Sequence, residues 1–409
     1  MMITRRIVLY ILLFTSLAMK AQESVNIQDS TTVAQDSIVK PWEQVMHERI
    51  DSLLSIDMLR TSQLGLLIWD LDADSALVAY NEQQTMRPAS TMKLLTAITA
   101  LDKLGGSYSL KTTLRYEGEI ADSTLKGNLI VTGSMDPLFS REDMLAFVEN
   151  IQMLGIDTIY GTLRADRSMK DEDLLGEGWC WDDDNPVLSP LVYNRKDNFL
   201  ERLAQELQDA GIACVAPDSI LEIKGKTKNL CTRSHTVDQL LVRMMKESDN
   251  LYAEALFYQL AKAAGHRPAT AKQSATVIKQ MITKLGLTPS NYRIADGSGL
   301  SLYNYVSAEL MVRLLRYAYQ HDNILTHLLP TLPVAGMDGT LEKRMQGTAA
   351  EGIVKAKTGT LSAVITLAGY TTAPNGHKLC FAIMNQGILS SNAARDFQDK
   401  LCIILCSSE

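Results

Sequence analysis

The stretch that decides the fold runs from residue 88 to residue 101 and reads PASTMKLLTAITAL. Its proline precedes the apolar run Leu94 to Leu101, and a proline just before the first turn is typical of the start of a helix. We therefore expect Ser90 to lie at the N-terminus of a helix. Residues three positions apart share a helix face, so Lys93 should lie beside the Ser90 hydroxyl.

Two shorter motifs follow later in the chain, SDN at residues 248–250 and KTG at residues 357–359. An S-x-x-K pattern such as residues 90–93 arises about once by chance in a chain of this length, whereas each tripeptide arises only ~0.1 times. Each motif also has an ordinary structural explanation, as a helix cap for Ser90 or SDN and as a turn before a strand for KTG. The occurrence of all three in this order favours a shared catalytic site.

The three motifs supply the groups that acyl transfer to a serine requires. A serine hydroxyl attacks a carbonyl only after a neighbouring base has removed its proton, and Lys93 can be that base when its amine is neutral. Burial lowers the pKa of a lysine, and the charge of Lys357 would lower it further. Ser248 can relay the proton toward the leaving group, and Asn250 can hold the base and the substrate amide by hydrogen bonds.

A developing oxyanion needs hydrogen-bond donors, and the backbone N–H groups of Ser90 and Thr360 are the expected pair. Gly359 leaves room for the close approach of the strand that carries Thr360. Lys357 also attracts an anionic substrate terminus. Because none of the three motifs contains histidine, a Ser/His/Asp hydrolase is disfavoured.

Taken together, these motifs resemble the set found in penicillin-binding proteins and class A β-lactamases. Over about residues 45–400 the chain resembles the low-molecular-mass class C penicillin-binding proteins, the D-alanyl-D-alanine carboxypeptidase/endopeptidase family S13. The long gap between the first two motifs also resembles that family, in which modules are inserted there. Four further segments carry the resemblance, namely residues 133–137, 178–183, 296–301 and 336–341.

The resemblance implies an α+β fold, with a penicillin-binding/β-lactamase-like transpeptidase domain and an inserted α/β module. It implies a penicillin-sensitive serine DD-peptidase that cleaves D-Ala-D-Ala termini or D-Ala cross-bridges of peptidoglycan through an acyl-enzyme on Ser90. Peptidoglycan stem peptides would be its partners and β-lactams its covalent inhibitors, with no metal or organic cofactor. Thr358 and Gly359 would bind substrate. A β-lactamase or esterase on the same scaffold, or a non-catalytic peptidoglycan-binding protein, are the alternatives.

Two positions decide how the resemblance extends to substrate choice. Asp183 stands where the family holds the free amino end of the peptide's diamino acid, although a solvated acidic loop with Asp182 and Asp184 explains it equally well. An arginine that binds the substrate side chain usually follows the segment 296–301, and here that position is Leu302. The recognition of that side chain therefore remains open.

Hydrophobic periodicity divides the chain into a catalytic domain at residues 41–105 and 236–409 and an inserted module at residues 106–235. One antiparallel sheet should be assembled from both ends of the chain, with helices around it. We expect strands at residues 64–71, 76–80, 110–116, 127–132, 158–165, 220–223, 364–371 and 379–384, and helices at 42–59, 94–101, 143–153, 197–210, 237–247, 251–264, 274–285, 307–319 and from 392.

The N-terminus has the pattern of a secretory signal, because Arg5 and Arg6 precede a short apolar run that ends in small residues. Cleavage after Ala21 or Ala18 fits, and the predicted segments are a signal peptide at 1–21 and a flexible leader at 22–40. A retained anchor is the alternative, although the run is shorter than the ~20 residues that span a bilayer. The mature protein should be periplasmic.

Composition excludes several classes of protein and site. Of the 409 residues, 46% are hydrophobic and 21% charged, which is ordinary for a globular protein. A net charge of −7 argues against a nucleic-acid partner. Six cysteines without a CxxC pair and six scattered histidines argue against a zinc site. Buried free thiols are favoured over the one disulfide considered, Cys214 with Cys231.

Overall fold

The computed structural model describes residues 41–180, 185–214, 217–220 and 226–408. The predicted signal peptide and leader lie outside these residues, as does Asp183. Within the described part of the chain, no helix combines the length and the apolar character needed to cross a membrane.

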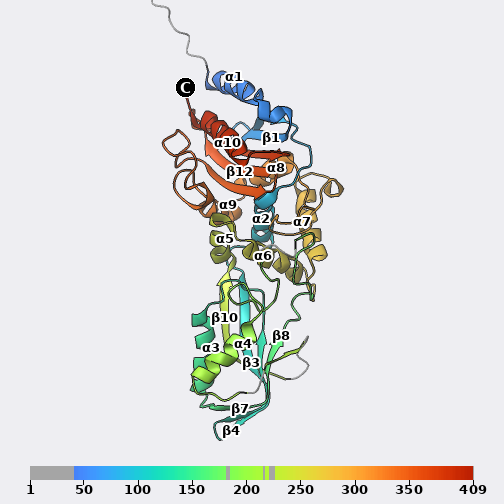
Figure 1. Ribbon diagram of the computed structural model, residues 1–409, viewed down its shortest axis with the longest axis vertical. Coiled ribbons are helices and arrows are strands. Elements are labelled where there is room, and N and C mark those ends of the chain that lie inside the picture. Colours follow the sequence, from blue (N-terminus) through green and yellow to red (C-terminus); the bar gives the residue numbers. More distant parts are fainter. Residues whose placement is uncertain (1–40, 181–184, 215–216, 221–225, 409) are drawn as a thin grey trace, which may run out of the picture. The chain divides into compact units, whose positions relative to one another are not determined.

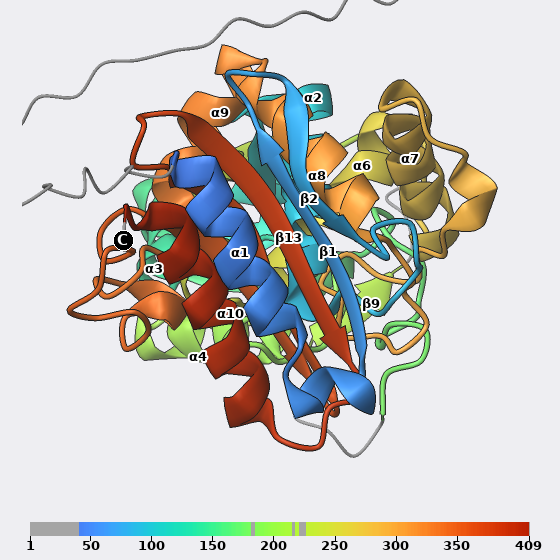
Figure 2. The same cartoon turned by 90° about the horizontal axis from the view of Figure 1, so that it is seen from above.

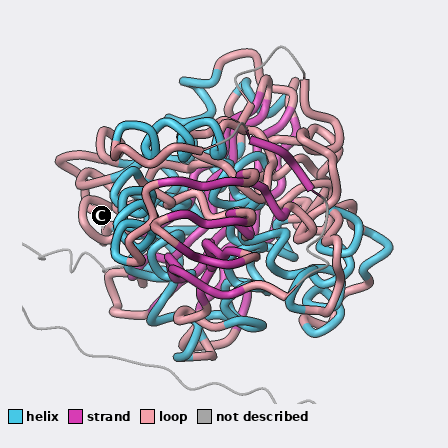
Figure 3. Tube along the Cα trace, turned by 90° about the horizontal axis from the view of Figure 1, so that it is seen from below, coloured by secondary structure: helices cyan, strands magenta, loops and turns pink. Residues whose placement is uncertain are grey.

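A five-stranded antiparallel sheet is built from the two ends of the chain, as predicted (Figures 2 and 3). In this sheet β1 pairs with β13 over its whole length, so that Leu67 lies opposite Ala382. The strand order is β11-β12-β13-β1-β2. The strands are β1 (Gln63–Asp70), β2 (Ser75–Tyr80), β11 (Lys355–Leu361), β12 (Val364–Thr372) and β13 (Lys378–Gln386).

Helices cover both faces of this sheet, which explains why its central strands β12, β13 and β1 are buried along most of their length. On one face, α1 (Trp42–Leu54) and α10 (Ser391–Cys406) lie across β1 and β13 (Figure 2), and Leu66 shares their core. The next residue, Leu67, points the other way and joins the core of α2 (Met92–Leu104) and α8 (Ala308–Tyr319).

The helix α6 runs through the second core and positions much of the candidate site. Its residues are buried from Leu251 to Ala261, and it packs against α2, α5 and α7. The helices around it are α5 (Val237–Lys246), α6 (Asn250–Ala263), α7 (Ala271–Lys284) and α9 (Asp322–Leu328). Short 3₁₀ turns complete this part, namely η1 (Asp57–Arg60), η2 (Ala89–Thr91), η3 (Pro289–Asn291), η4 (Leu329–Thr331) and η5 (Gly339–Leu341).

A second five-stranded sheet, of order β10-β3-β6-β8-β9, occupies the predicted inserted module (Figure 1). It mixes antiparallel and parallel pairs, and a small sheet β4-β5-β7 lies beside it in the topology. Its elements are β3 (Ser109–Tyr116), β4 (Glu119–Ala121), β5 (Thr124–Lys126), β6 (Leu129–Thr132), α3 (Arg141–Met153), β7 (Thr158–Tyr160), β8 (Leu163–Asp166), α4 (Phe199–Asp209), β9 (Pro217–Ile220) and β10 (Lys228–Thr236). The helices α3 and α4 share a core of their own with this sheet.

Parts of the predicted module nevertheless pack into the core of the catalytic helices. Met135, Met169, Trp179 and Leu188 all belong to the cluster that contains α2 and α6. The boundaries of the module, 106–235, therefore remain a prediction, and they enclose both a separate sheet and segments that support the catalytic part.

The structure differs from the predicted elements in several places: β4, β5 and α9 were not predicted, and the strand expected at 220–223 lies mostly outside the described residues. The strand expected at 158–165 is two strands, which separate at Gly161, where a Cβ atom would meet the carbonyl oxygen of Gly127 at 2.0 Å. The helix expected at 42–59 ends at Leu54. Strand β10 was not predicted, because its sequence KNLCTRSHT is mostly polar at an edge of the sheet. All six cysteines are free thiols, as predicted, but only Cys380 and Cys402 are buried, and Cys180 is exposed.

Candidate active site

The candidate nucleophile lies on a tight turn immediately before α2. Ser90 belongs to the 3₁₀ turn η2, and Ala89 before it has a left-handed φ of 47°. Two hydroxyls donate to the carbonyl oxygen of Pro88, from Thr91 at 2.6 Å and from Thr366 at 2.7 Å. The turn is therefore fastened both to its own helix and to strand β12.

The side chain of Lys93 reaches Ser90, as the helical spacing predicted. Its Nζ donates to Ser90 Oγ at 2.9 Å, to Asn250 Oδ1 at 2.7 Å and to the carbonyl oxygen of Ser298 at 2.9 Å. The side chain is fully buried. Burial lowers the pKa of Lys93 to about 8, against the opposing effect of Asp296 and other carboxylates.

The SDN motif is both a helix cap and part of this cluster. Asp249 caps α6 by accepting the N–H of Leu251 at 3.0 Å, so the ordinary structural explanation holds for this residue. Its two neighbours make other contacts. Asn250 Oδ1 accepts a hydrogen bond from Lys93, and Ser248 Oγ accepts one from Lys357. Ser248 has a left-handed φ of 62°.

The second buried lysine comes from the KTG motif on β11. Lys357 Nζ donates to Ser248 Oγ at 2.8 Å and to the carbonyl oxygen of Thr358 at 2.8 Å. Burial lowers the pKa of Lys357 well below its ordinary value, and the charge of Lys93 lowers it further. The sequence predicted that burial and the charge of Lys357 would lower the pKa of Lys93. Burial does so, whereas the repulsion between the lysines lowers the pKa of Lys357.

The absence of a side chain at Gly359 allows β11 to touch the nucleophile turn. A Cβ atom there would lie 2.9 Å from the backbone nitrogen of Ser90 and 2.2 Å from Thr366 Oγ1. Strand β11 is an edge strand, and Thr360 is exposed on it. Thr358 Oγ1 donates to Thr340 Oγ1 at 2.7 Å. The predicted oxyanion donors, on Ser90 and Thr360, thus come from two segments in close contact.

A layer of buried acids behind Lys93 was missed at the level of sequence. Glu254 accepts the N–H of Ser298 at 2.8 Å and that of Gly297 at 3.1 Å. Asp296 accepts the N–H groups of Gly299 and Ser301 at 2.8 and 2.7 Å. These bonds fix the segment that contains Ser298. The carbonyl oxygen of Ser298 accepts the hydrogen bond from Lys93 Nζ.

A signal for Glu254 does exist in the sequence, because it is a lone acid in an apolar helix, four residues after Asn250. Residues four apart lie on the same helix face. Burial, and then the charge of Asp296, raises the pKa of Glu254 to about 8. Ser298 acts through its backbone, which no residue pattern reveals.

The same segment also presses on the nucleophile turn and reaches into the predicted module. Gly299 has a φ of 81°, and a Cβ atom there would lie 1.8 Å from the carbonyl oxygen of Ala89. Trp179 donates from Nε1 to Asp296 at 2.8 Å. Leu302, at the position of the family's arginine, is 37% exposed, and its carbonyl oxygen accepts from Arg87 at 3.0 Å.

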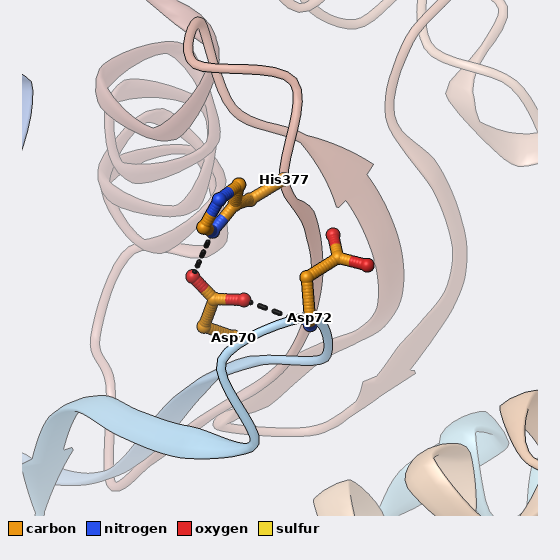
Figure 4. Close-up of side chains that lie close together, drawn as sticks. All are labelled: Asp70, Asp72 and His377. Carbon is orange, nitrogen blue, oxygen red and sulfur yellow. Dashed lines mark hydrogen bonds and ion pairs between the residues drawn. The ribbon is translucent and has the colours of Figure 1, made fainter.

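One group of possible metal ligands occurs among the described residues, away from the three motifs, where the β1–β2 and β12–β13 turns meet (Figure 4). His377 Nδ1 lies 2.7 Å from Asp70 Oδ2, and the other oxygen of Asp70 accepts the N–H groups of Asp72 and Ala73 at 2.9 Å. Asp72 accepts the N–H of Lys378 at 2.6 Å. These hydrogen bonds explain the group as a brace between two turns.

Comparisons with known proteins identify D-Ala-D-Ala carboxypeptidases as similar to this chain. A family model described as the D-Ala-D-Ala carboxypeptidase 3 (S13) family matches residues 46–193 and 185–407. The D-alanyl-D-alanine carboxypeptidase DacB of Haemophilus influenzae is 27% identical over 78% of this chain and 84% of its own. The D-alanyl-D-alanine carboxypeptidase of Actinomadura sp. strain R39 is also 27% identical, over 88% of this chain and 84% of its own.

Solved structures agree with the family comparison. Penicillin binding protein 4 (dacB) of Haemophilus influenzae superposes with a TM-score of 0.79 at 25% identity, covering 86% of this chain and 97% of that chain. A structure of the same protein complexed with a β-lactam gives a TM-score of 0.73. The predicted fold class, an α+β penicillin-binding fold, is therefore confirmed.

Proposed function

Because the chain belongs to the D-Ala-D-Ala carboxypeptidase 3 (S13) family, we propose that it acts on peptidoglycan stem peptides through an acyl-enzyme on Ser90. The observation that carries the proposal is the position of Lys93 Nζ, within hydrogen-bond distance of both Ser90 Oγ and Asn250 Oδ1. A second hydroxyl–amine pair, Ser248 with Lys357, is anchored two residues before Asn250.

In acylation, neutral Lys93 accepts the proton of Ser90 as Oγ attacks the carbonyl carbon of the penultimate D-Ala. The N–H groups of Ser90 and Thr360 stabilise the oxyanion. The C–N bond then breaks, and the departing amine of the last D-Ala, or of a cross-bridge, takes a proton through Ser248. Water then hydrolyses the ester, which regenerates the Ser90 hydroxyl.

Substrate binding is assigned to groups around this cluster. Lys357 and Thr358 hold the terminal carboxylate, because an anion beside Lys357 opposes the burial that lowers its pKa and so favours the ammonium, and the Thr358 hydroxyl can donate to the same anion. Gly359 admits the peptide backbone to this strand. Asp183 is proposed to hold the free amine of the diamino acid.

The predicted signal peptide places this activity in the periplasm, where stem peptides are found. β-Lactams are proposed as covalent inhibitors that acylate the same hydroxyl, and a β-lactam complex of the Haemophilus influenzae relative supports this assignment. Residues 106–235 are proposed as the inserted module of the family.

Labelling with a fluorescent penicillin tests the proposal. Ser90→Ala should abolish covalent labelling and leave the fold intact, since only the nucleophile's oxygen is removed. Ser234→Ala, at an exposed serine on β10, is the matched control and should label like the wild type. Labelling of Ser90→Ala, detected on denaturing gels and by mass spectrometry, would refute the assignment of the nucleophile.

A further inference from the structure

A cavity of about 850 Å³ lies at the opposite end of α6 from the proposed active site. Its walls come from residues 167–174, residues 188–197 and the loop after α6 at Arg267 and Pro268. Because α6 spans 14 residues, its two ends are separated by about 20 Å. None of the residues assigned to the reaction lines this cavity, whose volume suits a small ligand.

Two arginines in the wall keep hydrogen-bond capacity. Arg167 donates from Nη1 to Asp197 at 2.7 Å, and its Nε has no partner among the described residues. Arg267, with a side chain 61% exposed, donates to Ser168 Oγ and also pairs with Asp166, its Nη2 lying 3.5 Å from Asp166 Oδ2. A guanidinium has five N–H donors, so both groups can also bind a carboxylate.

Of the other four charged groups of the wall, Lys170, Asp171 and Asp197 are paired and Glu172 is available. Lys170 is buried and bonded to the Asp171 carboxylate, and its Nζ lies 4.6 Å from the centre of the Tyr258 ring. Glu172 is exposed and has no ion pair within the described part of the chain. Apolar surface is supplied by Leu174, Leu188, Pro190 and Pro268.

We propose that this cavity is a second binding site for a peptide with a free carboxylate, an ammonium group and small apolar side chains. On the proposed function, which this inference extends, a stem peptide has this chemistry. The guanidinium groups of Arg167 and Arg267 bind its carboxylate, and Glu172 faces its ammonium.

The cavity is also connected to the active site through its wall. In this wall the N–H of Leu188 donates to the carbonyl oxygen of Leu174 at 2.9 Å. Trp179, five residues after Leu174, donates to Asp296, which fixes the loop behind Lys93. A stem peptide held in the cavity would keep the peptidoglycan to which it is attached near Ser90. It would also stabilise the loop at residues 296–298 that supports Lys93.

When penicillin occupies the active site, peptide binding to the proposed second site can be measured alone. The protein is first acylated with penicillin, so that Ser90 is occupied, and then titrated by calorimetry with a stem tetrapeptide that ends in a free carboxylate. The same peptide with a C-terminal amide is the matched ligand. We expect binding of the acid and weaker binding of the amide. Arg267→Gln should weaken binding of the acid by roughly 10-fold.

Two variants show whether a loss of peptide binding comes from a change in the cavity or from unfolding of the protein. Arg60→Gln, at an exposed arginine of η1, is the control and should bind like the wild type. Arg267→Glu, which reverses a charge on an exposed side chain, should abolish binding while penicillin labelling persists. Absence of binding to the acyl-enzyme, or equal binding by Arg267→Gln, overturns the second site.

The test also distinguishes this proposal from the proposed function. If penicillin labels the protein but no peptide binds the acyl-enzyme, only the second site fails. If penicillin does not label the protein, the proposed function fails. The titration of Arg267→Gln against the unmodified wild type then decides whether the cavity binds the peptide.

Discussion

The chemistry of a single residue, Lys93, depends on how much its surroundings favour the neutral amine. Three acceptors surround Nζ, which suits an ammonium, but the side chain is buried, which opposes the charge. These effects leave the pKa of Lys93 at about 8. A base must be deprotonated to act, so the active fraction increases as pH rises through this value.

The rate of acylation by penicillin should therefore rise with pH on an acid limb centred near pH 8. Stopped-flow or gel-based labelling between pH 5 and pH 10 measures this limb. Replacing any of the six histidines should leave it in place, because none lies in the three motifs. A limb that disappears with one histidine would mean that an imidazole, not Lys93, is the base.

Glu254 should affect the position of that limb, after burial and the charge of Asp296. In Glu254→Gln the side-chain carbonyl can still accept the N–H of Ser298, but the negative charge that Glu254 carries above its own pKa of about 8, and that raises the pKa of Lys93, is gone. We expect the acid limb to shift to lower pH, with labelling retained. Glu119→Gln, at an exposed glutamate of β4, should leave the limb unchanged.

A purely structural Glu254 would give a different result. The Gln variant would then react more slowly at every pH, with the limb in its original place. Glu254→Ala adds a second measurement, because it removes the acceptor as well as the charge. Its labelling should fall further than that of the Gln variant.

At the scale of elements, the site depends on the contact between the edge strand β11 and the turn η2. Gly359 is the point of contact, since a Cβ atom would approach both Ser90 N and Thr366 Oγ1. The sequence predicted this close approach from the KTG motif alone. It did not reveal that Thr366 on the neighbouring strand fastens the same turn through Pro88.

Gly359→Ala should therefore separate β11 from η2 and damage the oxyanion site. We expect labelling to fall by at least an order of magnitude and the protein to lose roughly 1 to 3 kcal/mol of stability, as overpacking costs. Thr360→Ala on the same strand keeps its backbone N–H and should label normally. Thermal melts and labelling rates on both variants make the comparison. A fully active Gly359→Ala would place the oxyanion donors elsewhere.

The sequence predicts helices well where their ends carry signals. The predicted start of a helix after Ser90 and the cap at Asp249 are present, because proline and capping residues act locally. Strand β10 and the partners of Lys93 on residues 296–298 depend on distant segments. Periodicity cannot reveal them, since a polar edge strand and a backbone carbonyl leave no apolar pattern.

At the scale of the whole molecule, the predicted module contains two kinds of segment. Its outer hairpin, β4 and β5, has no contact with the three motifs in the described structure. Other parts support the site directly, because Trp179 donates to Asp296 and Arg195 donates to Asp249 at 2.9 Å. Hydrophobic periodicity predicted a boundary between the module and the catalytic part, but it could not reveal these contacts, which join residues far apart in the chain.

Two deletions should therefore differ in their effect on penicillin labelling. Removing residues 118–127 and joining Glu117 to Asn128 by an Asn-Gly turn should preserve labelling. The backbones of Glu117 and Asn128 already bond each other at 3.0 and 3.2 Å, as a two-residue hairpin requires. Removing all of 106–235 should leave a soluble product with much weaker labelling, since the catalytic sheet remains but Trp179 and Arg195 are lost.

The variant Trp179→Phe shows whether this loss comes from Trp179 itself. It removes the N–H that Asp296 accepts and part of a buried ring but keeps an aromatic side chain, so it should reduce the labelling rate without unfolding the module. Circular dichroism and penicillin labelling of all three proteins decide between the outcomes. If the complete deletion folds and labels at the wild-type rate, the segments around Trp179 and Arg195 do not support the active site. If the short deletion abolishes labelling while the protein stays folded, the outer hairpin contributes to catalysis through the rest of the module.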